Sequence, residues 1–70
     1  MEIFNLDNHP HVELCVLLKF HGWCESGGAA KEVIAEGQVK VDGKVETRKR
    51  CKIVADQVVE FNGGKVMVKP

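Results

Sequence analysis

The sequence predicts an α+β fold in which two short helices pack on a small antiparallel sheet. Apolar residues recur at helical spacing as far as residue 36, and from Val39 onward they alternate with polar residues in the two-residue period of a strand. The chain has 70 residues, of which 44% are hydrophobic and 29% are charged. A chain of this length supports one small core, so we expect a single domain over residues 1–70 with no room for a deep catalytic cleft.

A short strand and a first helix are predicted before residue 22. The apolar run of residues 3–6 predicts the strand, and two polar residues that favour turns follow it. Pro10 suits a first helical position because its missing N–H has no partner to lose there. Three leucines between residues 14 and 18 then share one helical face. We therefore expect a helix over residues 10–21, ended by Gly22 in a left-handed conformation.

A second helix is predicted over residues 27–36. Ser26 is a favourable N-cap because its hydroxyl can accept a hydrogen bond from an amide of the first turn, and Gly37 ends the helix as Gly22 ends the first. Trp23 lies between the two helices and is expected to close the core there rather than to stack on a base. The two helices are thus expected to be joined by a tight connection.

The second half of the chain predicts strands joined by turns. Val39 and Val41 begin a strand, and Asp42-Gly43 supplies the two positive-φ residues of a type I′ hairpin turn, after which Val45 continues the pattern. Further strands are expected at residues 53–54, 58–61 and 66–68, with turns at residues 55–57 and 62–64. These strands would form the antiparallel sheet.

The charge is distributed unevenly although the total is zero, with ten Lys and Arg against ten Asp and Glu. Residues 1–37 hold two basic and six acidic residues, a net charge of minus four, and residues 53–70 are neutral. Residues 38–52 hold six basic and two acidic residues, a net charge of plus four. Because screening limits each charge to about 8–10 Å, this block can attract phosphate locally, although a run of Lys and Arg can also be a solvated face.

The order of these features resembles the ribosomal-protein-S-four-like RNA-binding domain. The resemblance runs over about residues 13–61 and rests on a helix that ends in Gly-Trp, on residues 26–31, on the stretch Glu36-Gly37-Gln38-Val39-Lys40-Val41-Asp42-Gly43-Lys44 and on Thr47-Arg48-Lys49. Residues 9–15 and 46–53 also look like the small stand-alone bacterial members of the YbcJ type. The resemblance implies an αL motif, a helix–loop–helix with a hairpin that lies against structured RNA.

The expected RNA-binding residues come from the resemblance and from the basic block. By resemblance, the family's basic positions are matched by Lys31, Lys40, Lys44, Arg48 and Lys49, and the basic block adds Arg50 and Lys52. Two departures from the family pattern remove positive charge from the helical side, since Gly27 and Glu13 stand where basic residues are common. We therefore expect the hairpin side to make most of the cationic contacts with RNA.

Gly27-Gly28 allows two interpretations. A glycine pair after the cap leaves the helix amides open to a phosphate, and it also suits close packing of the helix on a strand. Phe4, Phe20 and Phe61 lie on apolar segments and are expected in the core, which leaves little provision for stacking on bases. Binding would then depend on phosphate and 2′-hydroxyl contacts with folded RNA.

The predicted function is non-catalytic binding of structured RNA, ribosomal or transfer RNA, in association with a ribosome or another ribonucleoprotein. The alternative is a protein-interaction module of such an assembly, with the acidic and basic halves docking on a protein and no direct RNA contact. No nucleophile–base pair, phosphate loop or carboxylate pair stands out, so we expect no enzyme activity. We expect no cofactor and a monomer, since no exposed apolar stripe is evident.

The cysteine and histidine residues allow a third, less favoured hypothesis, a metal or thiol site. Its candidates are Cys15, Cys24, Cys51, His9, His11 and His21, but only the two histidines around Pro10 have the close spacing of zinc ligands. We therefore expect no metal. Three cysteines without a paired motif suit reduced thiols in the cytoplasm, and Cys51, among Lys and Arg, is expected to have a stabilised thiolate. The N-terminus has no basic region of a secretory signal, and no apolar run is long enough to cross a membrane.

Overall fold

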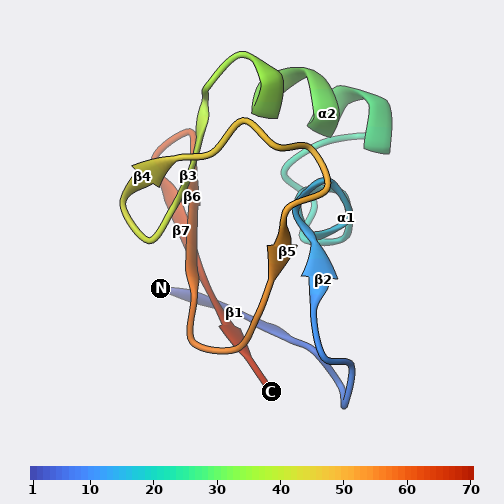
Figure 1. The fold of residues 1–70 in the computed structure, drawn as a ribbon, viewed down its shortest axis with the longest axis vertical. Coiled ribbons are helices and arrows are strands. Elements are labelled where there is room, and N and C mark those ends of the chain that lie inside the picture. The colour runs from blue at the N-terminus through green and yellow to red at the C-terminus, as the bar shows by residue number, and fades with distance from the viewer.

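The computed structural model describes residues 1–70 and shows an α+β fold with two short helices and seven strands (Figure 1). The helices are α1 (Leu14–Phe20) and α2 (Gly27–Ala35). The strands are β1 (Glu2–Asn5), β2 (Val12–Glu13), β3 (Val39–Val41), β4 (Lys44–Val45), β5 (Lys52–Ile53), β6 (Val58–Phe61) and β7 (Gly64–Lys69). Neither helix has the length and apolar character that crossing a membrane requires.

The main sheet is mixed, so the prediction of a wholly antiparallel sheet is wrong at one edge. Its strand order is β1-β7-β6-β3-β4, and β2 and β5 form a separate antiparallel pair. β1 runs parallel to β7, with Ile3 opposite Met67, and the other pairs are antiparallel. Parallel neighbours need a crossover between them. Here both helices and all the other strands lie between β1 and β7, a pairing that local sequence patterns do not encode.

The helices cover one face of this sheet and leave the other open. Val39, Val59 and Val66 have no exposed surface and pack in one core with Leu17 and Ile34 of the helices. Strand alternation turns the residues between them to the opposite face, where the cross-strand neighbours Lys40, Glu60 and Lys65 lie. The side chains of the inner face therefore supply the core, as the period-two pattern predicts.

The first helix begins four residues later than the sequence indicates. Residues 12–13 are not helical but form β2, which pairs with β5. Glu13 precedes α1 and offers no side-chain cap. Instead, the amides of Leu14 and Cys15 donate to the carbonyls of Cys51 and Lys49 at 2.9 and 3.2 Å. The start of α1 is thus set by contact with a distant segment, which overrides the local signal of Pro10.

The signals at the start of α2, at the C-terminal ends of both helices and at the first hairpin turn are confirmed, whereas β7 begins at Gly64, which the sequence places in a turn. The Ser26 hydroxyl accepts from the Ala29 amide at 3.1 Å, and Gly22 and Gly37 have φ angles of 82° and 78°. Asp42 and Gly43 have φ angles of 52° and 82°, the two positive values that a type I′ turn requires. These conformations depend on residues close together in the chain, which explains why the sequence predicts them.

The aromatic residues are placed only partly as expected. Trp23 is partly buried, and its ring lies against His21 at 4.9 Å and Phe61 at 6.2 Å between ring centroids, so it covers the edge of the core. Phe4 and Phe61 also pack against the core. Phe20 is 70% exposed, so its assignment to the core is wrong. It is the last residue of a seven-residue helix, and the buried face of that helix is already formed by its other apolar residues.

Candidate nucleic-acid interface

Three cations from separate segments line one open hollow of about 580 Å³. They are Lys44 on β4, Arg48 in the loop after it and Lys52 on β5, and all three are exposed. Arg50 adjoins Arg48 and Lys52 in a neighbouring depression. One face therefore gathers four of the predicted basic residues, Lys44, Arg48, Arg50 and Lys52, whereas Lys49 lines neither depression. We call this face the basic face and define it as Lys44 together with the segment of residues 48–52.

The β3–β4 hairpin that carries Lys44 is tied to the start of β6. One carboxylate oxygen of Asp42 accepts from the Val58 amide at 2.9 Å, and the other accepts from the Gln57 side-chain amide at 3.3 Å. The Gln57 side chain in turn accepts from the Val54 amide at 2.9 Å. Asp42 thus has a structural role besides its place in the turn, because it fixes the β3–β4 hairpin beside the start of β6.

The basic segment, residues 48–52, is held through its backbone, which leaves the side chains of Lys49 and Arg50 exposed. As described above, the carbonyls of Lys49 and Cys51 accept from the first amides of α1. Lys52 lies on β5, opposite Glu13 of β2. Because these contacts use main-chain atoms, the exposed side chains of Lys49 and Arg50 remain available to a ligand.

Arg48 is not a free cation, because Glu46 binds it. Its Nε and Nη2 donate to the two Glu46 carboxylate oxygens at 3.0 and 2.9 Å, and its backbone amide donates to Glu46 at 2.9 Å. These hydrogen bonds lower the pKa of the Glu46 carboxyl from 4.5 to about 2, and the carboxylate raises the pKa of the Arg48 guanidinium. Arg48 is therefore oriented, and part of its charge is neutralised.

The expected stabilisation of a Cys51 thiolate is wrong. The thiol is partly buried, donates to Glu46 Oε1 at 3.6 Å and accepts from Arg48 Nη2 at 3.6 Å. Burial and the Glu46 charge raise its pKa, and Arg48 opposes them only in part. The carboxylate of Glu46 lies next to Cys51, although the neighbouring residues in the sequence are mostly basic. The thiol is therefore protonated near neutral pH.

Two of the predicted site residues do not line the basic face. Lys40 is exposed between buried Val39 and Val41, and it lines a separate depression with Glu60 and Phe61 on the outer side of the sheet. Lys31 lies on α2 and is partly buried. The structure therefore divides the predicted basic set into a group gathered on the basic face and two separate lysines.

The Gly27-Gly28 pair is not needed for close packing. A Cβ at Gly27 would have no atom within 4 Å, and one at Gly28 would meet only Ser26 Oγ at 3.8 Å. The interpretation that a side chain would collide with a neighbouring strand is therefore wrong.

The cysteines and histidines form no metal centre. Cys15, Cys24 and Cys51 are free, and no three His, Cys, Asp or Glu side chains gather where they could hold a metal ion. Burial raises the pKa of the Cys24 thiol. His21 instead pairs with Glu2 at 3.1 Å, joining the end of α1 to β1.

Sequence reasoning missed the two acidic residues that shape the basic face. The sequence predicts only a turn role for Asp42, and it counts Glu46 only as one of the two acidic residues of residues 38–52. The Glu-x-Arg spacing of residues 46–48 is a weak local sign of their pairing, since both residues lie in one extended segment. The contact between Asp42 and Val58 joins residues far apart in the chain and has no such sign.

The sequence matches the S4 domain family over residues 4–69, so this chain belongs to the S4 domain family. Its relatives include a protein of Escherichia coli strain K12 named "Putative RNA-binding protein YbcJ" and the YbcJ protein of Shigella flexneri. Each is 69% identical over 68 residues, which is 97% of this chain and 97% of the relative. The solution structure of E. coli YbcJ, described as having an αL motif involved in RNA binding, is similar as well. It has a TM-score of 0.77 and 67% identity, covering 100% of this chain and 89% of that one. These matches confirm the resemblance and the fold.

Proposed function

We propose that this protein binds structured RNA through the basic face and performs no chemistry. The observation that carries the proposal is the gathering of Lys44, Arg48 and Lys52, from three segments of the chain, around one hollow. The backbone of this face is held by the Asp42 contacts and by α1, so the cations are placed before a ligand arrives. Cations carried on a held backbone suit the phosphates of folded RNA, whose base edges are hidden in a deep groove.

Support for an RNA ligand also comes from the family. The relatives in Escherichia coli carry names and descriptions that refer to RNA binding, and their similarity extends over almost the whole chain. On this proposal the ligand is ribosomal or transfer RNA, met as part of a ribosome or another ribonucleoprotein. The protein would act as a monomer in the cytoplasm, where its three free thiols stay reduced.

Within this interface the cations contribute unequally. Lys44, Lys49, Arg50 and Lys52 carry most of the phosphate contact, and Arg48 contributes through the guanidinium hydrogens that Glu46 leaves free. Lys31 and Lys40 lie outside the basic face and act as secondary contacts for a large RNA. Four or five neutralised phosphates correspond to a log–log dependence of affinity on salt with a slope of roughly minus three to minus four.

A salt titration with two matched variants tests this proposal. The affinity for a folded RNA, such as bulk transfer RNA, is measured over a range of salt concentrations for the wild type. The same is done for a Lys44→Ala, Lys52→Ala double variant and for a control, Lys65→Ala with Lys69→Ala, that removes the same charge from β7. We expect the first variant to weaken binding and flatten the slope by about two, and the control to keep the wild-type slope. Equal effects of the two variants would contradict a binding role for the basic face.

A pull-down with and without nuclease treatment separates RNA binding from the protein-interaction alternative. An RNA-dependent association is lost after nuclease treatment. A partner that remains bound without RNA would support the alternative and overturn the proposal.

A further inference from the structure

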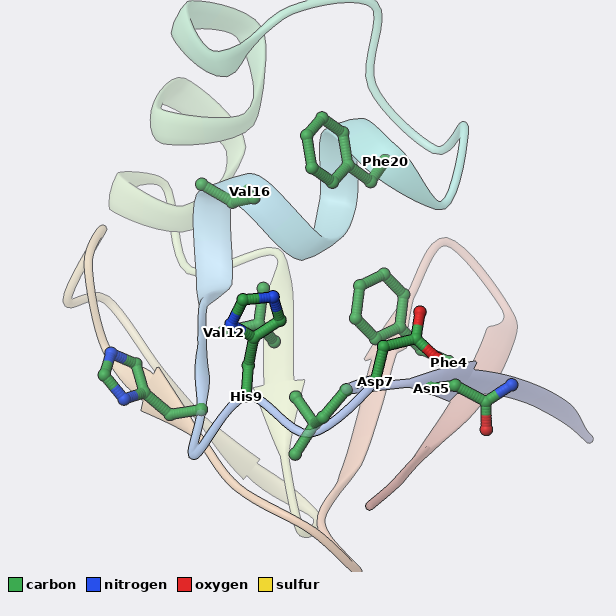
Figure 2. A pocket seen from close by; sticks show the side chains of 9 residues that line it. Phe4, Asn5, Asp7, His9, Val12, Val16 and Phe20 are labelled. Atoms are coloured by element: carbon green, nitrogen blue, oxygen red, sulfur yellow. The ribbon is translucent and has the colours of Figure 1, made fainter.

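A second hollow shares no lining residue with that of the basic face and lies between β1, β2 and α1 (Figure 2). It encloses about 340 Å³, and more than half of its lining residues are apolar. Figure 2 shows the Phe20 ring above it, from α1, and the Phe4 ring below it, from β1, with His9 and Asp7 at its rim. An apolar hollow with a few polar groups at its edge has the composition of a site for a small ring-shaped group.

Phe20 is the feature of this hollow that calls for an explanation. Isolated exposed apolar side chains are ordinary on protein surfaces. Phe20, however, is 70% exposed, is the one aromatic residue among the large exposed apolar residues, and borders a hollow. The Lys19 ammonium lies 5.9 Å from the centre of its ring. The ammonium lies over one face of the ring, so the other face is left for a planar group, and Lys19 supplies a charge for an anion attached to that group.

The rim of the hollow favours a ring with a polar edge over a purely apolar side chain. Asp7 is exposed, and its carboxylate can only accept hydrogen bonds when ionised. His9 is also exposed and offers a ring nitrogen on the other side of the hollow. A nucleobase combines an apolar face with N–H groups on its edge. It therefore matches both the walls and the rim.

The hollow is also close to the basic face. Val12 of β2 lines the hollow and pairs with Ile53 of β5, while the next pair joins Glu13 to Lys52 of the basic face. Neighbouring strands lie about 4.8 Å apart. Alternation turns the Lys52 and Val12 side chains to opposite faces of this strand pair, so an RNA held at Lys52 reaches the hollow by passing around β2.

We propose that this hollow takes one unpaired base of the RNA bound at the basic face, stacked on Phe20. The inference rests on the proposed function and narrows its substrate class to RNA that presents an unpaired base, in a bulge or a loop, beside a paired stem. The basic face holds the phosphates of the stem. The hollow selects for the unpaired base, which supplies discrimination that phosphate contacts alone lack.

The test compares two RNA hairpins of the same stem sequence, one fully paired and one with a single bulged 2-aminopurine. Affinities for both are measured with the wild type and with Phe20→Leu, which keeps an apolar side chain but removes the aromatic face. Phe20→Trp keeps a face for stacking, and Ile3→Ala is a matched control at another exposed apolar side chain, 55% exposed on β1. Fluorescence of the 2-aminopurine reports stacking directly.

We expect the wild type to prefer the bulged hairpin by about tenfold, which corresponds to about 1.4 kcal/mol, and to quench the 2-aminopurine. Phe20→Leu should remove the preference and the quenching without changing the affinity for the paired hairpin. Phe20→Trp and Ile3→Ala should retain both.

Equal wild-type affinity for the two hairpins would overturn this inference and leave the proposed function standing. A preference that Phe20→Leu retains would also overturn it, since an apolar contact would then suffice. Binding of neither hairpin would overturn the proposed function and this inference together.

Discussion

Replacing Glu46 by Gln tests how the basic face is organised, because Glu46 accepts most of the hydrogen bonds that orient Arg48. Two side-chain hydrogen bonds of 2.9 and 3.0 Å and one from the Arg48 backbone amide converge on its carboxylate. They lower the pKa of the carboxyl from 4.5 to about 2. At about 1.4 kcal/mol for each pKa unit, this difference alone would correspond to roughly 3 kcal/mol.

Solvent screening reduces that figure. The Arg48 side chain is 75% exposed, although that of Glu46 is only 17% exposed, so the pair behaves largely as a surface ion pair. Such pairs contribute up to about 1 kcal/mol. We therefore expect Glu46→Gln to lower the free energy of unfolding by about 1 kcal/mol at pH 7, or the melting temperature by roughly 4–8 °C for a domain of this size.

The dependence on pH identifies the charge as the cause. A carboxyl whose pKa is lower in the folded state stabilises the fold above its unfolded pKa, and this contribution is lost as the pH falls through the folded pKa. The difference between wild type and Glu46→Gln should therefore be complete above about pH 5 and shrink from pH 4.5 toward pH 2. Chemical denaturation followed by circular dichroism at a series of pH values measures it.

A control variant separates this effect from a general change in charge. Glu32→Gln removes one negative charge from an exposed position on α2 and should change the stability little at any pH. A Glu46→Gln difference that stays constant down to pH 2, or one no larger than that of Glu32→Gln, would refute the reasoning.

Three further predictions concern single positions. Alkylation of Cys51 should remain slow at neutral pH and be slower than that of a small free thiol, because its pKa is raised, and mass spectrometry after a timed reaction checks this. Gly64→Ala should lower stability by about 1–2 kcal/mol and shift the tryptophan fluorescence, since the new Cβ would lie 3.0 Å from the Trp23 ring; unchanged fluorescence would count against this packing. Gly28→Ala should raise the free energy of unfolding by up to about 1 kcal/mol, because the site is open and alanine favours a helix, and thermal denaturation checks this. A loss of stability would restore the packing interpretation.

Features that depend on neighbouring residues could be predicted from the sequence. Ser26 caps α2, Gly37 ends it, and Asp42-Gly43 turns the hairpin, each as its own side chain or backbone freedom requires. The alternation of valines likewise gave the buried face of β3. The resemblance to the S4 family added the expectation of RNA binding, and three basic residues that follow the hairpin turn, Lys44, Arg48 and Lys52, do line one hollow.

Features that depend on distant partners could not be predicted in this way. Pro10 is a good helix-start residue, yet α1 begins at Leu14 because carbonyls from residues 49 and 51 meet its first amides. Phe20 is on an apolar segment, yet the short helix turns it to the solvent. In both cases a preference read from one segment competes with tertiary contacts that a pattern of residues does not contain.

The sequence by itself determined that this protein is a small α+β domain of the S4 type with a positive block after its hairpin. Its helix caps, turns and alternating valines are set by residues close together in the sequence. The tertiary structure alone decided that β1 pairs with β7, that Lys52 lines the same hollow as Lys44, and that Asp42 binds the Val58 amide. Charges and pairings of this kind depend on distances through space, and the folded backbone sets those distances.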